Sequence, residues 1–160
     1  MAFSSDHIQR VVREMARFWQ HERTRINAQI GRTGMRARNV GLGSSFSEQK
    51  IAARKETKFK RWMGGKTSRD IELIEAVCRF IAIEYHDGRI PFEEADAVAN
   101  LLWEYESAYM TERITPPILW DVYTAFDAGE YHRSKDQSDD PVVEFTNPAI
   151  ARIVSRLNVA

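Results

Sequence analysis

The sequence predicts an all-α fold, and two observations carry that prediction. Apolar residues recur at helical spacing through most of the 160 residues, and proline, glycine or capping side chains stand between these stretches. Only Val142 to Phe145 has the composition of a strand, and one strand without a partner makes no sheet. We therefore expect one compact helical domain, with a helix-turn-helix-like N-terminal half and an acidic helical C-terminal half.

The first expected helix follows Ser4, Ser5 and Asp6 and reaches about residue 28. Its apolar stripe consists of Ile8, Val11, Val12, Met15, Phe18, Trp19 and Ile26. Its arginines fall mostly off that stripe and give the helix a basic solvent face; they are Arg10, Arg13, Arg17, Arg23 and Arg25. Four glycines then interrupt the pattern between residues 31 and 45, where we expect a basic loop.

Two successive short helical segments are expected between Ser47 and Met63, and Gly64-Gly65 ends the second of them. The next helix runs to Asp87-Gly88, and it is followed by helices that open at Pro91 and at Pro116-Pro117. After a polar linker, Asn147-Pro148 opens the last helix. Cys78, the single cysteine, lies on an apolar stripe and is expected to be a small core residue.

The formal net charge of zero conceals two opposite halves. Residues 1–70 carry 16 Lys or Arg and 6 Asp or Glu, a net charge of +10, whereas residues 71–160 carry 7 and 17, a net charge of −10. We expect a basic helical region over 1–87, an acidic helical region over 88–133 that packs on it or mediates oligomerisation, and a linker with a terminal helix over 134–160. A basic half of this strength is typical of a polyanion-binding surface, so double-stranded DNA is the first expected partner.

The sequence contains no motif that favours catalysis. The four histidines are scattered without metal-ligand spacing, and there is no nucleophile elbow, Walker lysine or kinase signature. No apolar run approaches the length of a membrane span, and no signal peptide follows Met1. We expect a cytoplasmic protein that is no enzyme, holds no cofactor or metal and does not contact membranes.

The residues from Phe59 to Phe80 resemble the second half of a lambda-repressor-like (Cro/XRE-type) helix-turn-helix domain. In that family a tryptophan and a Gly-Lys pair end the recognition helix, as Trp62 and Gly65-Lys66 do here, and a loop leads into a helix patterned like Ile71, Ile74 and Val77. Upstream, Ser47 to Ala52 resembles the first helix of the motif. The resemblance covers residues 47–80 and implies a small transcriptional regulator that binds DNA sequence-specifically.

The residues themselves support a DNA-facing helix. At 100° per residue, Phe59, Trp62 and Met63 point one way and leave a polar, basic face opposite. In a major groove such a face can offer Lys or Arg to guanine and Thr to a thymine methyl, while flanking cations neutralise phosphates. The expected DNA-binding residues are Arg36, Arg38, Arg54, Lys55, Thr57, Lys58, Lys60, Arg61, Lys66 and Arg69.

Two alternatives remain open. A basic helical face is often only solvated surface, and an aromatic residue among cations can stack on single-stranded bases, although Trp62 is expected in the core. The rival function is a non-enzymatic protein-interaction module, such as an antitoxin-like, anti-repressor or phage inhibitor protein. The acidic half carries the expected anchors for a homodimer or a protein partner, most of which are expected to pack internally: Trp103, Tyr105, Tyr109, Trp120 and Tyr123.

Overall fold

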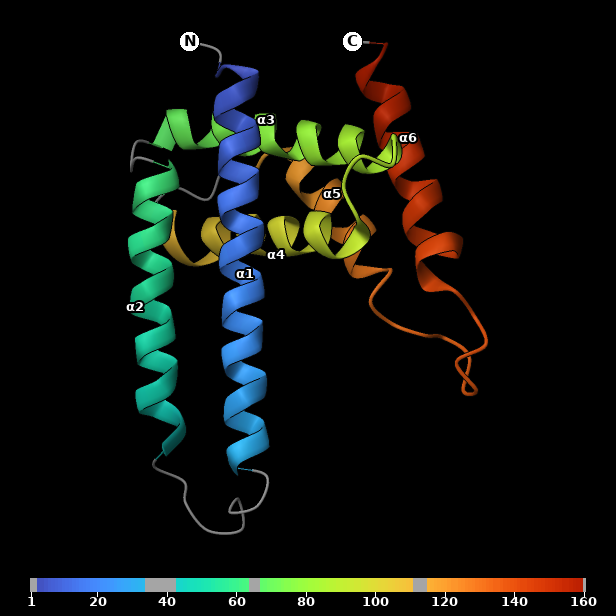
Figure 1. Ribbon diagram of the computed structural model, residues 1–160. Helices are drawn as coiled ribbons and strands as arrows, with labels where there is room; N and C mark the ends of the chain where they lie inside the picture. Colours follow the sequence, from blue (N-terminus) through green and yellow to red (C-terminus); the bar gives the residue numbers. More distant parts are fainter. Residues whose placement is uncertain (1–2, 34–42, 64–66, 111–114, 160) are drawn as a thin grey trace.

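The structure is a computed structural model that describes residues 3–33, 43–63, 67–110 and 115–159 (Figure 1). These residues form six α-helices and one π-helical turn, and they contain no strand. The elements are α1 (Ser5–Thr33), α2 (Gly43–Met63), α3 (Thr67–His86), α4 (Phe92–Tyr109), α5 (Pro117–Asp127), η1 (Val142–Thr146) and α6 (Asn147–Leu157). The predicted all-α fold class is confirmed.

The two longest helices, α1 and α2, run side by side, and α3 and α4 cross them (Figure 1). α1 packs on α3 and α4, while α5 and α6 complete the body on the other side. The C-terminal end of α1 and the N-terminal end of α2 extend past α4 with no other helix beside them (Figure 1). We call this extension the arm.

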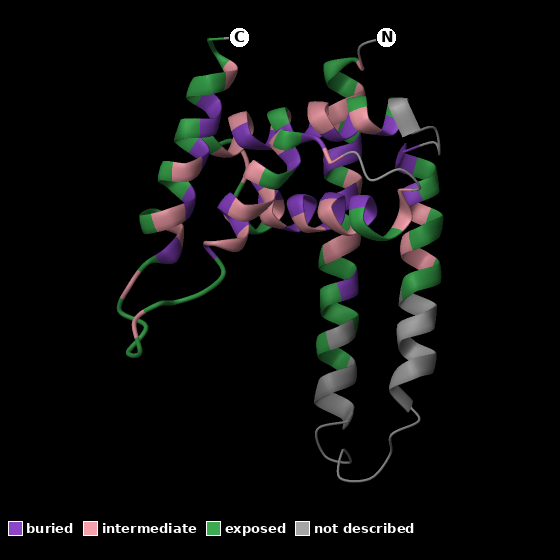
Figure 2. Cartoon of the chain, turned by 180° about the vertical axis from the view of Figure 1, so that it is seen from behind, coloured by how far each residue is buried: buried purple, intermediate pink, exposed green. Residues whose placement is uncertain are grey.

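All six α-helices contribute side chains to one hydrophobic core. Its fully buried members include Met15, Phe59, Ile74, Leu101, Phe126 and Ile150, one from each helix. The buried residues concentrate where α1 and α2 meet the crossing helices, as Figure 2 shows. Cys78 belongs to this core, as expected, and its burial raises the pKa of the thiol. Because the core lies where α1 and α2 meet the crossing helices, the rest of the protein packs against only one end of these two helices.

Local chemistry explains several helix ends. Gly88 has a φ of 72°, the left-handed conformation that favours glycine, and it stops α3 as the sequence predicts. Pro117 and Pro148 occupy the first turns of α5 and α6, where a missing N–H costs nothing. Gly129 follows α5 for a different reason, because a Cβ there would clash with Thr146 Oγ1.

The expected boundaries in the basic half are wrong. Residues 47–63 belong to one continuous helix rather than two short segments, because the Arg-Lys-Glu-Thr run at 54–57 contains no helix breaker and its charged residues are good helix formers. α1 continues to Thr33 and α2 begins at Gly43, so the expected loop over 31–45 is shorter at both ends. Arg36, Arg38 and Lys66 lie outside the described residues.

Val142–Phe145, the residues with the composition of a short strand, do not form one. These residues form the π-helical turn η1, which leads directly into α6. The Arg133 guanidinium lies 3.7 Å from the centre of the Phe145 ring and covers one face of it. The polar segment before η1 is organised by Asp139, whose carboxylate accepts a hydrogen bond from the Arg133 N–H at 2.7 Å.

Candidate nucleic-acid interface

An open groove lies between α1 and α2. Its volume is about 540 Å³, and both helices line it with polar and charged side chains around Phe18. The lining residues are Glu14, Arg17, Phe18, His21, Glu22, Arg25, Arg54, Thr57, Lys58 and Arg61. Those from α1 recur every three or four residues and therefore share one face of that helix. We call this feature the basic groove.

The basic groove carries an excess of positive charge. Five of its residues are Lys or Arg, and only Glu14 and Glu22 are acidic. The Glu22 side chain is 4% exposed, and its Oε1 lies 3.3 Å from Arg25 Nη1 and 3.5 Å from Arg54 Nη1. A buried carboxylate thus holds guanidinium groups from both helices at the groove. Such fixed guanidiniums lose less side-chain entropy when they bind an anion.

Glu14 orders the groove nearer the body. Its Oε2 accepts a hydrogen bond of 3.1 Å from Trp62 Nε1, and its Oε1 lies 3.5 Å from Arg61 Nη2. Trp62 itself is buried against Phe59 and Phe18, which confirms that it belongs to the core. The core tryptophan therefore fixes the carboxylate that in turn positions an exposed arginine.

The basic surface continues from the groove toward the N-terminus. A smaller adjoining hollow shares Glu14 and Arg61 with the groove and adds His7 and Arg10. Burial, together with Arg10 and Arg69, lowers the pKa of His7. Along α1, basic side chains thus line the two hollows from Arg10 to Arg25, a distance of about 22 Å at 1.5 Å per residue.

The structure places the expected DNA-binding residues of α2 on different sides. Arg54, Thr57, Lys58 and Arg61 line the basic groove, and Thr57 Oγ1 donates a hydrogen bond of 2.9 Å to the Ala53 carbonyl. Lys60 is exposed outside the groove, where its Nζ lies 2.7 Å from Glu56 Oε1. Arg69 is exposed at the start of α3, with its guanidinium 5.6 Å from the centre of the Phe3 ring.

Lys55 does not flank an exposed basic face, contrary to expectation. Its side chain is 16% exposed, and its Nζ donates hydrogen bonds of 2.6 Å and 2.8 Å to the two carboxylate oxygens of Glu104 on α4. It also lies 5.6 Å from the centre of the Trp19 ring. Lys55 therefore ties α2 to the acidic half.

Sequence reasoning missed the α1 side of the groove. Arg17, His21 and Arg25 stand four residues apart, and this spacing was a sufficient signal that they share one face. The sequence alone predicts that this face is exposed to solvent, because nothing in it shows that α2 lies beside α1. The groove is therefore a product of tertiary structure.

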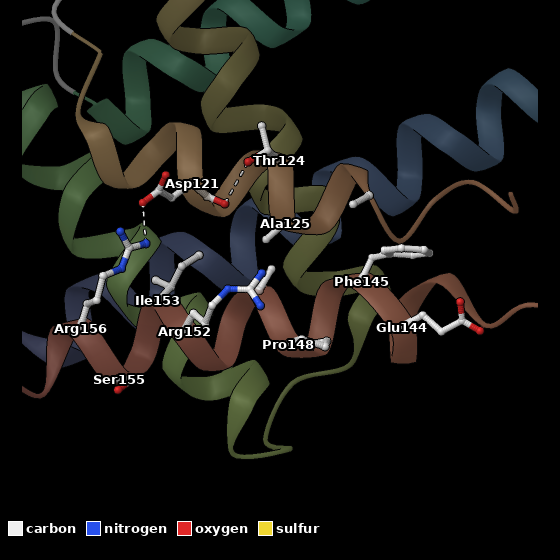
Figure 3. A pocket seen from close by; sticks show the side chains of 12 residues that line it. Asp121, Thr124, Ala125, Glu144, Phe145, Pro148, Arg152, Ile153, Ser155 and Arg156 are labelled. Carbon is white, nitrogen blue, oxygen red and sulfur yellow. Dashed lines mark hydrogen bonds and ion pairs between the residues drawn. The ribbon is translucent and has the colours of Figure 1, made fainter.

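A larger hollow lies elsewhere, between α5 and the η1–α6 segment, and has a volume of about 800 Å³ (Figure 3). Arg156 and Asp121 form an ion pair of 2.7 Å across it, and Arg152 and Glu144 also line it (Figure 3). Within the described residues, no group of three or more His, Cys, Asp or Glu side chains is arranged to hold a metal ion. None of the helices described is long and apolar enough to cross a membrane.

Comparisons with known proteins give no further assignment: no family model matches the chain, and neither the curated proteins nor the solved structures contain a match.

Proposed function

We propose that this protein binds double-stranded DNA through the basic groove and acts as a cytoplasmic transcriptional regulator. The observation that carries the proposal is the convergence of Arg17, Arg25, Arg54, Lys58 and Arg61 from two helices on one open hollow. The basic surface along α1 spans about 22 Å, a length over which several phosphates of a DNA duplex can be contacted. Regularly spaced phosphates are the polyanion that fits this length.

The arrangement favours phosphate contacts for affinity. Arginine offers a planar set of donors that fits phosphate oxygens, and Glu14 and Glu22 already orient three of the groove arginines. Arg17 and Lys58 have no ion-pair partner among the described residues, so they are the cations freest to contact phosphate.

The repressor-like interpretation assigns base contacts to the C-terminal half of α2. Phe59 and Trp62 are buried, as a recognition helix packed on its domain requires, and Thr57 and Lys60 are exposed. In this proposal that half of α2 approaches the major groove while cations of the basic groove hold the phosphates beside it. Because α2 is one continuous helix, its N-terminal part, which belongs to the arm, lies on the same axis as the half that approaches the major groove.

Salt-dependent DNA binding tests the proposal. Fluorescence anisotropy with a mixed-sequence duplex measures Kd between about 50 and 200 mM salt. If all five groove cations neutralise phosphates, the slope of log K against log salt is about −4.5, and affinity falls about 500-fold over that range. The Arg17→Gln/Lys58→Gln variant should have a slope near −2.7 and lose only about 40-fold.

The matched control is Arg79→Gln/Lys135→Gln, which removes the same charges from exposed positions outside the groove. We expect this control to bind nearly as the unchanged protein does. An equal loss in both variants would mean that net charge, rather than the basic groove, sets affinity. Absence of binding by the unchanged protein at low salt would refute the DNA proposal.

A protein-interaction module remains the second candidate function, and one observation favours it. Trp120 is 52% exposed in a cluster of aromatic residues on the acidic half, where a partner protein could cover it. In this alternative the protein binds no DNA and forms a stable complex with a protein. The same anisotropy experiment separates the two functions.

A further inference from the structure

Four aromatic residues on α4, α5 and the segment after α5 form an incompletely covered surface. The Trp103 ring stacks on Tyr123 at 4.8 Å between centroids and lies 5.2 Å from Trp120. Trp120 is 52% exposed, and Tyr131 beyond them is 58% exposed. Large aromatic rings normally bury most of their area, so a cluster left open in this way fits an interaction surface.

Carboxylates border these rings. Burial, together with Asp127, Glu130 and Asp96, raises the pKa of Tyr123, and Asp127 stands four residues after Tyr123 on the same face of α5. Asn100 Nδ2 donates hydrogen bonds of 3.0 Å to Asp96 Oδ1 and 3.2 Å to Glu130 Oε1, and so holds two of the carboxylates together. Burial and the neighbouring carboxylates raise the pKa of Asp96 to about 7, while Arg23 lowers it, and Lys55 lines the same hollow as Asp96 and Glu130.

We call the combination of Trp103, Trp120, Tyr123, Tyr131, Asp127 and Glu130 the acidic aromatic surface. Aromatic faces beside carboxylates recognise Lys and Arg, since the ring attracts the cation and the carboxylate pairs with it. The partner chemistry that fits is therefore a surface with several fixed cations.

The chain itself carries such a surface. The basic groove belongs to the half with a net charge of +10, and the acidic aromatic surface belongs to the half with −10. The two features share no residue, and none of the ion pairs and cation–π contacts found among the described residues joins them; a hollow of about 600 Å³, lined by Glu22 of the groove and Glu130 of the surface, lies between them. Because both are built on packed helices of one body, docking of the aromatic rings into the groove requires a second molecule.

We propose that the acidic aromatic surface docks into the basic groove of a second copy of this chain, in a head-to-tail contact. Such a contact uses different surfaces on the two molecules, so each pair keeps one free groove and one free acidic aromatic surface. Association therefore extends or closes into a ring rather than stopping at a symmetric dimer. This inference goes beyond the DNA proposal and stands without it; if both hold, DNA and the second copy compete for the groove.

Two complementary variants test the contact. The groove variant is Arg17→Glu/Lys58→Glu, and the surface variant is Trp120→Ala/Glu130→Lys; circular dichroism establishes that each is folded. Sedimentation at about 50 mM salt should show that the unchanged protein associates further as its concentration rises, and that about 500 mM salt dissociates it. Each variant alone should be a monomer.

The decisive sample is an equimolar mixture of the two variants. The groove variant still has an intact acidic aromatic surface, and the surface variant still has an intact groove, so the mixture should form dimers and nothing larger. Arg79→Glu/Lys135→Glu, with the same charge change outside the groove, should associate as the unchanged protein does. A monomeric unchanged protein, a surface variant that still associates, or a mixture that stays monomeric would each overturn the proposal.

The DNA measurements keep the two proposals separable. The surface variant should retain DNA affinity, because its substitutions lie outside the groove, whereas the groove variant should lose both activities. Self-association without DNA binding would leave this inference standing and refute the DNA proposal. DNA binding by a protein that stays monomeric would support the DNA proposal and refute this inference.

Discussion

A hydrogen bond between α3 and α4 offers the most direct test of the core. Tyr105 on α4 donates from its hydroxyl to Asp70 Oδ2 in the first turn of α3, at 2.8 Å. Asp70 is buried, and its Oδ1 has no hydrogen-bond partner among the described residues. The tyrosine hydroxyl is therefore an important polar contact of a carboxylate removed from water.

Tyr105→Phe should destabilise the protein by about 2–3 kcal/mol. Hydrogen bonds to charged groups contribute about 1.5–3 kcal/mol, and the substitution leaves a buried acceptor unsatisfied. It creates no cavity, because the ring stays in place against Phe59, 5.1 Å away between centroids. For a chain of this size the expected drop in Tm is roughly 4–12 °C.

Urea unfolding followed by circular dichroism measures this change, and Tyr109→Phe is the matched control. Tyr109 belongs to the same ring cluster, 6.2 Å from Tyr105 between centroids, but no hydrogen bond of its hydroxyl is found among the described residues. Its loss should cost less than about 0.5 kcal/mol. Equal stability of the two variants would refute the assignment of the Tyr105–Asp70 bond.

Three further substitutions or treatments probe other parts of the molecule. Gly129→Ala should destabilise by about 1–3 kcal/mol in urea unfolding, because the added Cβ clashes with Thr146 Oγ1; a neutral result would contradict the packing of η1 on α5. Asp96→Asn should stabilise the protein more at pH 8.5 than at pH 5.5. Burial and the neighbouring Glu130 raise the pKa of Asp96 in the folded protein to about 7, above the unfolded value of about 3.9. Between these two pKa values the folded state binds more protons than the unfolded state, so the free energy of unfolding falls as the pH rises. Urea midpoints of both proteins at the two pH values measure this, and an equal pH dependence in both would refute it. Cys78 should react with a thiol reagent only when the protein unfolds, because it is fully buried and burial raises the pKa of its thiol; rapid modification of the native protein would place it elsewhere.

Most of the helical architecture follows from the sequence. The apolar stripe of Ile74, Val77 and Ile81 predicts α3 and its buried face, and Gly88 predicts its end; the structure confirms both. The boundary errors at residues 47–63 have one source. The apolar residues fall into two groups, around Ile51 and around Phe59, which suggested two short helices, but the residues from Arg54 to Thr57 between them contain no helix breaker.

The candidate site was predictable only in part. The 100° spacing correctly puts Phe59 and Trp62 inside and leaves Arg54 and Arg61 outside. It could not predict that Lys55 binds Glu104, 49 residues away, because such a pair depends on how α2 packs on α4. For the same reason the α1 half of the basic groove emerges only once the two helices lie side by side.

The separation of charge has an energetic consequence that connects the fold to both proposals. Of the ion pairs found among the described residues, Lys55–Glu104 joins the two halves, so the five groove cations repel one another with only Glu14 and Glu22 in the groove to balance them. Glu14 and Glu22 relieve that repulsion locally and, by doing so, keep the arginines fixed at the groove. A bound polyanion or the carboxylates of a second copy would relieve the rest. Salt should therefore act in opposite directions: screening lowers repulsion within the groove and stabilises the isolated molecule, while it weakens every complex that the groove forms.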